Sequence, residues 1–188
     1  MSVITKGKIF GAIKCYMYTI EWQQHGLPHA HILTWLQDEL HVHRVDDFIS
    51  AELPDPVIDP LLFSSVKTQM VHGPCGSINP NSPCMKDNKC TKRFPRYLLK
   101  ETQTGQDGYP LYHQRKPEDC GFTTTIRVCG CEVEVENRWI VPHCPLLTRL
   151  FNAHINVEYC HSEIHQMCVQ VHIYIYISTK DLTWLYLA

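Results

Sequence analysis

The chain has 188 residues, enough for one domain of ordinary size, and 44% of them are hydrophobic against 19% charged. That balance excludes a disordered or low-complexity protein. The apolar runs are too short to cross a bilayer and the N-terminus lacks an apolar core with a cleavage site, so no membrane partner and a nuclear or cytoplasmic location are expected. The formal net charge is −2, so binding to nucleic acid requires a local basic patch.

Cysteine and histidine are unusually frequent, with ten and twelve copies. In a secreted chain ten cysteines would indicate disulfides, but no secretory signal precedes them. Reduced thiols that take part in metal sites therefore fit the composition better than disulfide bonds do.

The N-terminal third predicts a hairpin followed by a helix. Residues 8–20 are rich in Ile and Tyr and predict a strand, and residues 21–36 predict its return partner after a glycine-containing loop. A helix is expected from Asp59, because Asp is a favoured N-cap and Pro60 suits the first turn. Apolar residues then recur every four positions until Gly73 ends the helix.

The rest of the chain alternates irregular segments with short regular ones. Residues 72–100 contain Pro, Gly, Asn and Ser at spacings that forbid regular structure, and residues 101–119 predict a polar loop. Residues 122–141 alternate and predict a hairpin that turns at the C-G-C tripeptide. A short helix that runs into a strand is expected over 146–158, and the string VQVHIYIYIS predicts a last strand.

His29 and His31 flank one small residue in the string PHAHIL. Alternate residues of a strand share a face, so both imidazoles are expected on the same side of a sheet. With a three-residue loop, Gln23 would lie opposite His29 and Glu21 opposite His31, which would add an oxygen ligand. Such a mixed, open set favours a catalytic Mg²⁺ or Mn²⁺ over structural zinc, and a plain polar strand face is the alternative.

A second candidate site lies in the turn-rich segment. His72, Cys75, Cys84 and Cys90 follow the pattern H-x2-C-x8-C-x5-C. Four such ligands in a segment too irregular to build its own core are typical of a tetrahedral site in which Zn²⁺ supplies the folding free energy. Unpaired loop thiols at Cys84 and Cys90 are the alternative.

Basic and aromatic residues follow the cysteines closely. Positive charge for phosphates and aromatic rings for stacked bases are what a groove for single-stranded nucleic acid needs. A solvated charged loop is the alternative interpretation. The candidate DNA-binding residues are Lys89, Lys92, Arg93, Phe94 and Arg96, in a run that also contains Lys86, Tyr97 and Lys100.

Several ordered strings of the chain resemble one family. The string YTIEWQQHGLPHAHIL resembles the His-hydrophobe-His motif of rolling-circle replication initiators, in the version found in the Helitron helicase-like domain. The cysteine-rich segment and the strings DGYPLYHQR, NRWIVPHCPLL and FNAHINVEYC resemble later blocks of that domain in the same order, over residues 8–162. The resemblance implies an α+β fold: a central antiparallel sheet that carries the His-x-His motif, helices on one face, and a Cys-rich zinc-binding loop.

The resemblance also implies an HUH-type endonuclease that nicks and rejoins single-stranded DNA. In this family a tyrosine attacks a backbone phosphorus and becomes joined to the 5′ end, while a divalent ion on the histidine pair polarises the phosphate. The three cysteines of the loop match family positions, and Cys160 in NVEYC also matches and is the alternative to His72 as fourth zinc ligand. The expected cofactors are Mg²⁺ or Mn²⁺ at His29 and His31, and Zn²⁺ at the cysteines.

Three departures from the family pattern bear on activity. The chain starts after the family's leading strand and contains no G-x-x-x-x-G-K-[ST] loop, so a fragment without the helicase portion is expected. The family's tyrosines lie on a helix, whereas Tyr174 and Tyr176, the nearest candidates here, have strand-like spacing. Residues 166–173 can be encoded by codons that, read one base later, give K-C-V-Y-K-Y-I, which resembles the family's tyrosine helix. This predicts a frameshift in the gene near residues 163–166.

Two functions therefore stay open. The first is a partial Rep-like nuclease domain over residues 1–165 with impaired or absent activity, a basic cysteine-rich insertion at 72–100, and a divergent, out-of-frame tail at 166–188. The second is a zinc-containing module that binds single-stranded DNA without cutting it. An unproductive transposon relic is a third interpretation. A covalent adduct between protein and DNA separates the first function from the second.

Overall fold

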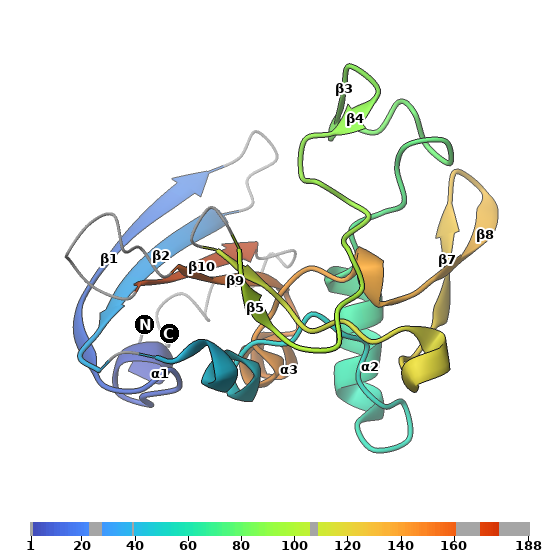
Figure 1. Cartoon of the computed structure of the whole chain (residues 1–188). Coiled ribbons are helices and arrows are strands. Elements are labelled where there is room, and N and C mark those ends of the chain that lie inside the picture. Colours follow the sequence, from blue (N-terminus) through green and yellow to red (C-terminus); the bar gives the residue numbers. More distant parts are fainter. Residues whose placement is uncertain (1, 23–27, 39, 106–108, 161–169, 177–188) are drawn as a thin grey trace.

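The computed structural model describes residues 2–22, 28–38, 40–105, 109–160 and 170–176 (Figure 1). These residues combine small antiparallel sheets with a few short helices, so the α+β class expected from the sequence is confirmed. No helix in this part of the chain is long and apolar enough to cross a membrane. The main sheet has four antiparallel strands, in the order β1 (Ile13–Trp22), β2 (Pro28–Leu36), β10 (Gln170–Tyr176) and β9 (His154–Cys160).

The remaining elements are short. The hairpin predicted at 122–141 is confirmed as β7 and β8, and its turn needs Gly130, whose φ of 85° follows a φ of 51° at Cys129. Two positive φ angles give the tight turn whose twist suits a hairpin. The bounds are α1 Ser2–Thr5, η1 Val42–Asp47, α2 Pro60–Gln69, β3 Met85–Lys86, β4 Lys89–Cys90, β5 Gln103–Thr104, β6 Pro110–Leu111, η2 Pro117–Asp119, β7 Thr124–Val128, β8 Cys131–Val135, η3 Asn137–Trp139 and α3 Pro145–Phe151.

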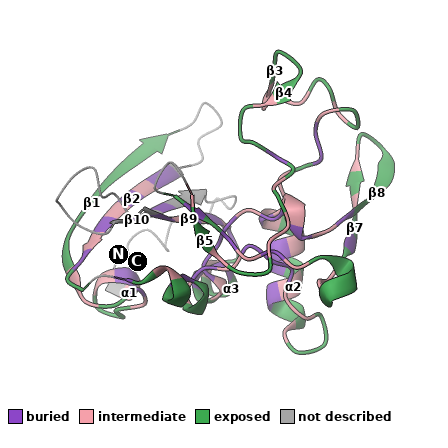
Figure 2. Cartoon of the chain, in the orientation of Figure 1, coloured by how far each residue is buried: buried purple, intermediate pink, exposed green. Residues whose placement is uncertain are grey.

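One face of the main sheet forms the larger hydrophobic core. Ile32 of β2 and Ile155 of β9 are buried there with Ile4 of α1 and Leu147 of α3. Burial of one such side chain stabilises the fold by about 2 kcal/mol. Figure 2 shows how β2 alternates between buried and less buried residues along its length. Because alternate residues of a strand point to opposite faces, the residues between these core positions point to the other side of the sheet.

Helix α2 begins as the sequence predicts. The Asp59 carboxylate accepts a hydrogen bond from the Leu62 N–H at 3.0 Å, and Pro60 occupies the first turn. Asp59 also accepts from Arg149 Nη1 at 2.7 Å, which ties the start of α2 to α3. The apolar positions spaced by four are buried in a second, smaller core, which contains Leu53, Leu62, Val66, Met70 and Ile140.

The end of α2 positions the first residue of the turn-rich segment. The helix ends at Gln69 and not at Gly73 as predicted, because Val71 leaves it to form an antiparallel bridge with Ile140. This bridge carries the chain to His72, whose N–H donates to the Trp139 carbonyl at 2.8 Å. Residues 72–100 then run without regular structure apart from the two-residue strands β3 and β4, as the composition predicts. In Figure 1 the β3–β4 segment stands apart from the main sheet.

A buried polar network anchors the far end of this segment. Glu52 is buried and accepts from Arg115 Nη2 at 2.6 Å, from Arg115 Nε at 3.0 Å and from the Asn137 side chain at 3.3 Å. Gln114 donates to the Ala51 and Asn137 carbonyls, and its backbone pairs with Leu99 in both directions. Buried polar atoms that are satisfied in this way hold loops rigidly without a hydrophobic core.

Two candidate metal centres

The register of the β1–β2 hairpin differs from the predicted one by two residues. Glu21 lies opposite His29 and Thr19 lies opposite His31, where Gln23 and Glu21 were predicted. The last pair of the ladder joins Trp22 to Pro28, whereas a three-residue loop would pair Pro28 with the residue two positions after Trp22. A slip of two keeps every residue on its own face, so Glu21 still stands beside both histidines. Gln23 lies outside the described residues.

Glu21, His29 and His31 form the first candidate centre. One ligand atom from each of the three lies within 4.8 Å of the others, and His31 Nε2 is 3.7 Å from Glu21 Oε2. The two imidazole centroids are 5.9 Å apart and the rings are inclined by 85°. The strands produce this arrangement directly, because the histidines are alternate residues of β2 and the carboxylate is a cross-strand neighbour.

The electrostatics of this centre favour the neutral form of His29. Burial lowers the pKa of His29, the neighbouring His31 lowers it further, and the Glu21 carboxylate opposes the shift. His29 is only 9% exposed, whereas the Glu21 side chain is 66% exposed, so the centre is open to solvent on the β1 side. Neutral imidazole nitrogen and carboxylate oxygen are ordinary ligands of divalent cations, so the donor set fits such an ion with coordination positions to spare.

A third histidine, His154, lies close enough to lower the pKa of His29 by its charge. It is the first residue of β9, and its Nδ1 contacts the Gln69 carbonyl at 2.5 Å, which places the ring proton on Nδ1. Burial lowers the pKa of His154 itself. No local spacing in the sequence points to His154, because only the pairing of β9 with β10 and of β10 with β2 brings it near the hairpin.

Strand β10 brings the two candidate tyrosines next to the histidine strand. Its register with β2 pairs Tyr174 with His31 and Tyr176 with His29. Cross-strand partners of an antiparallel ladder have Cα atoms about 4.5–5.5 Å apart. The strand-like spacing of the tyrosines is therefore confirmed, and their side chains lie outside the described part of the molecule.

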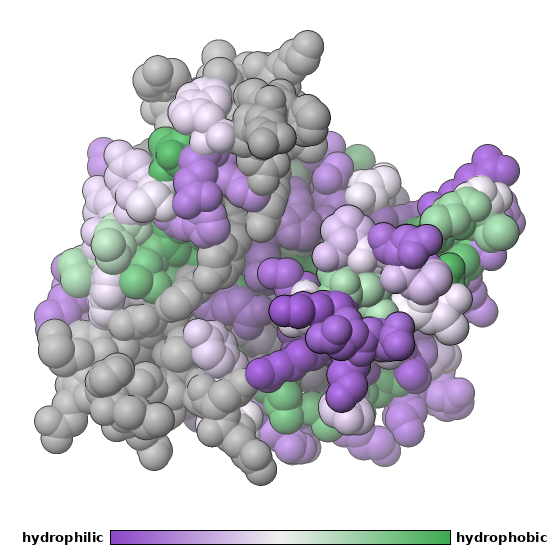
Figure 3. Space-filling view, turned by 90° about the horizontal axis from the view of Figure 1, so that it is seen from above, coloured by the Kyte–Doolittle hydropathy of each residue, from purple (hydrophilic) through white to green (hydrophobic). Residues whose placement is uncertain are grey.

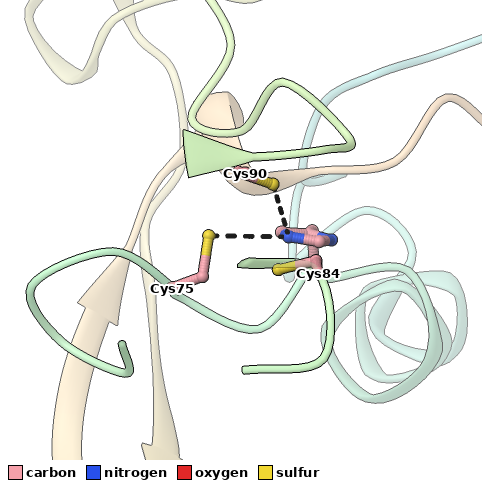
Figure 4. Close-up of side chains that lie close together, drawn as sticks. Cys75, Cys84 and Cys90 are labelled. Carbon is pink, nitrogen blue, oxygen red and sulfur yellow. Dashed lines mark hydrogen bonds between the residues drawn. The ribbon is translucent and has the colours of Figure 1, made fainter. Parts of the chain in front are cut away.

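The second candidate centre gathers three thiols around one imidazole. The ligand atoms of His72, Cys75, Cys84 and Cys90 all lie within 4.8 Å of one another. His72 Nε2 is 3.8 Å from the Cys75 sulfur and 3.5 Å from the Cys90 sulfur, the contacts drawn as dashed lines in Figure 4. A Cys₃His set is one of the ligand sets of structural zinc, so the cluster could hold a metal ion such as zinc.

Short backbone features place the thiols. Cys84 directly precedes β3 and Cys90 ends β4, and the turn between the strands contains two positive φ angles, at Asp87 (50°) and Asn88 (59°). Thr91 closes the hairpin, since both its N–H and its hydroxyl donate to the Cys84 carbonyl, at 2.8 Å and 2.9 Å. The hairpin thus turns the second and third thiols back toward the first.

The pKa values of His72, Cys75 and Cys90 are shifted by their surroundings. Burial, with hydrogen bonds to Cys90 and Cys84, raises the pKa of the Cys75 thiol to about 12. Burial also raises the pKa of Cys90, but the N–H groups of Phe94 and Lys92 outweigh it and leave that pKa below its usual value. Burial and the charges of Arg96 and Lys92 lower the pKa of His72, which keeps its ring neutral. A bound divalent ion deprotonates thiols of this kind outright.

Phe94 has a different place from the one predicted. Its ring is 9% exposed and stacks on the His72 imidazole, with centroids 4.2 Å apart and an interplanar angle of 12°. The Arg96 guanidinium lies 5.0 Å from its centroid. Phe94 therefore packs against the candidate zinc ligand, and its contact with DNA bases stays a prediction. Tyr97, at 85% exposure, is the accessible aromatic residue of this run.

The basic residues of the segment are at the surface. Lys89, Lys92 and Arg93 are exposed, and Arg96 is half-buried. Figure 3 shows strongly hydrophilic residues gathered where the β3–β4 segment faces the viewer. The Cys160 alternative stays a prediction, since the side chain of that residue of β9 lies outside the described ones.

One family model matches the N-terminal hairpin. The model of the Helitron helicase-like domain at the N-terminus matches residues 1–34, which include Glu21, His29 and His31. The match supports a Helitron-related domain and covers β1 and most of β2. A search of curated proteins finds no match.

Proposed function

We propose that this Helitron-related domain nicks and rejoins single-stranded DNA at the centre formed by Glu21, His29 and His31. The observation that carries the proposal is the convergence of two imidazoles and one carboxylate, within 4.8 Å, on the strands matched by the family model. A divalent ion such as Mg²⁺ or Mn²⁺ bound there would stabilise the charge that develops on a phosphate. The β1–β2 ladder places Glu21, His29 and His31 next to one another for this role.

Tyr174 is the proposed nucleophile, because its register position faces His31. In the reaction the phenolic oxygen forms a bond to phosphorus and the bond from phosphorus to the 3′ oxygen breaks. The phenol proton leaves to solvent or to a nearby base, and the 3′ oxygen takes up a proton. The DNA is then joined through its 5′ phosphate to the tyrosine, and attack by a 3′ hydroxyl reverses the step. Since the phosphoester count is unchanged, no ATP is needed.

We expect slow turnover. The tyrosines lie on β10 and not on the helix implied by the resemblance, so the phenol must reach the phosphate from a different direction. In-line geometry controls the rate of such a displacement, and small misplacements cost large factors.

A covalent adduct tests the proposal. The protein is incubated with end-labelled single-stranded DNA and Mn²⁺ and is separated on a denaturing gel. The expected result is a labelled protein band that is lost in Tyr174→Phe and in the double variant His29→Ala with His31→Ala. Tyr109→Phe is the matched control, since Tyr109 lies outside this sheet. No band from the parent protein under any metal condition would overturn the nuclease proposal.

The cysteine cluster favours a second candidate function, a zinc-containing module that binds single-stranded DNA without cutting it. The supporting observation is that the Cys₃His set lies next to the exposed residues Lys89, Lys92 and Arg93 in the chain. In this case DNA binding is salt-sensitive and needs the zinc ligands, and no adduct forms. Charge reversal at Lys89 and Lys92, which lie on or just after β4, is the sharpest variant for it.

A further inference from the structure

Strand β1 is an edge strand whose apolar residues are exposed. Its only partner in the described sheet is β2, and nine of its ten residues are exposed (Figure 2). Tyr16, Tyr18 and Trp22 are 47%, 52% and 63% exposed. Scattered apolar side chains on a surface need no explanation, but a run of them on a single strand marks an interaction surface.

The three rings lie on one face of the strand. Tyr16 pairs with Thr34 and Tyr18 with Ile32, both of which are buried residues of β2. Cross-strand partners share a face, so the rings extend the core face of the sheet beyond the helices that cover it. Glu21 and the two histidines are on the opposite face. We call Tyr16, Tyr18 and Trp22 the aromatic stripe.

We infer that the aromatic stripe is a stacking platform for unpaired bases of single-stranded DNA. The choice of ligand rests on the proposed function. Alternate residues of a strand are about 7 Å apart, so Tyr16 and Tyr18 present neighbouring π-faces, and Trp22 follows beyond Ile20 on the same face. Aromatic rings on a sheet surface stack unpaired bases of any sequence, because every base has a π-face. Duplex bases are already stacked on one another and cannot use the stripe.

The charge around the stripe matches a polyanion. The segment from Ser2 to Trp22 contains Lys6, Lys8 and Lys14 against the single carboxylate of Glu21, in a chain of net charge −2. All three lysines are exposed, and they precede or begin the strand. Phosphates are therefore attracted at the start of β1. At the other end, Trp22 adjoins Glu21, so DNA that passes over the edge of the sheet there reaches the first metal centre.

Anisotropy of a fluorescein-labelled oligothymidylate of about 15 nucleotides tests this inference, with zinc-loaded protein and no Mn²⁺. We expect Tyr16→Thr and Tyr18→Thr each to weaken binding by about tenfold, since one stacked base is lost and Thr suits a strand. Met17→Thr is the matched control, because Met17 is 55% exposed on the opposite face of the same strand, and it should leave the affinity unchanged. Circular dichroism establishes that each variant is folded.

Two results of the binding assay would overturn the inference. One is equal binding by the parent and both tyrosine variants, and the other is an equal loss in Met17→Thr. Sedimentation of the protein alone adds a further test: a dimer that dissociates on Tyr18→Thr would make the stripe an interface between two copies of the chain. If the stripe variants lose DNA binding and the parent protein forms no covalent adduct, the stacking platform stands and the nuclease proposal is refuted. If the parent protein forms the adduct and the stripe variants bind DNA as tightly as the parent, the nuclease proposal stands and the platform is refuted.

Discussion

The ring of Phe94 stacks on the imidazole of His72, with centroids 4.2 Å apart and planes inclined by 12°. The two residues are joined through the loop that carries Cys75, Cys84 and Cys90. The stack holds the only imidazole of the candidate zinc centre in the orientation that points Nε2 at the sulfurs of Cys75 and Cys90. Phe94, which the sequence predicts to stack on DNA bases, thus supports the candidate zinc ligand His72.

Phe94→Ala should therefore weaken zinc binding as well as stability. Removal of a buried ring costs about 3 kcal/mol in a core, and outer-shell partners of metal ligands affect affinity by about 10–100-fold. Competition with a chromophoric chelator measures the affinity, and urea unfolding measures the stability. Tyr97→Ala, which truncates an exposed ring of the same segment, is the control and should leave both unchanged. Unchanged zinc affinity in Phe94→Ala would contradict the supporting role.

Removal of the metal should unfold the cysteine segment while the sheet persists. The segment has little apolar burial of its own, so metal binding supplies its folding free energy. We expect chelated protein, or Cys90→Ser, to be cut by trypsin after Lys86, Lys89 or Lys92 much faster than zinc-loaded protein. Cys120→Ser, at an exposed thiol outside the cluster, should be cut like the parent. Mass spectrometry of the fragments locates the cuts, and equal cutting rates would refute a structural metal.

Mn²⁺ binding should depend on Glu21. Glu21→Gln removes a charge from a three-ligand set and should weaken Mn²⁺ binding by about tenfold, which corresponds to about 1.4 kcal/mol. Electron paramagnetic resonance of free Mn²⁺ measures the affinity with the zinc centre loaded. Thr19→Val is the matched control, since Thr19 lies opposite His31 on the same strand and offers no carboxylate.

The stability of the fold should fall in acid because of His143. This side chain is 1% exposed, its Nδ1 lies 3.1 Å from the Val141 carbonyl, and burial lowers its pKa to about 4. Between pH 6.5 and pH 4 the unfolded chain binds a proton at this residue and the folded chain does not, so the free energy of unfolding falls as pH falls. The full loss from this residue is about 3 kcal/mol.

Urea unfolding at a series of pH values measures this effect as a difference between variants. Between pH 6.5 and pH 4 the free energy of unfolding of His143→Gln should fall by about 3 kcal/mol less than that of the parent. His41→Gln, at an exposed histidine, is the control for the replacement itself. A parent and a His143→Gln variant with parallel pH curves would show that the residue does not titrate differently on folding.

Local chemistry fixed much of this molecule in advance. The N-cap at Asp59, the turn at Gly130 and the helix that runs into β9 all follow from residues adjacent in the chain. The pattern H-x2-C-x8-C-x5-C likewise selected the four residues that converge, because zinc ligands in turns are constrained by short loops.

The tertiary structure decided the rest, because pairing between distant segments is not written in any local spacing. It set the β1–β2 register, turned Phe94 inward beneath His72, and brought His154 toward His29. It also left β1 exposed on both faces. Register and burial depend on how much apolar surface the whole chain can remove from water at once, and a sequence window of a few residues does not contain that sum.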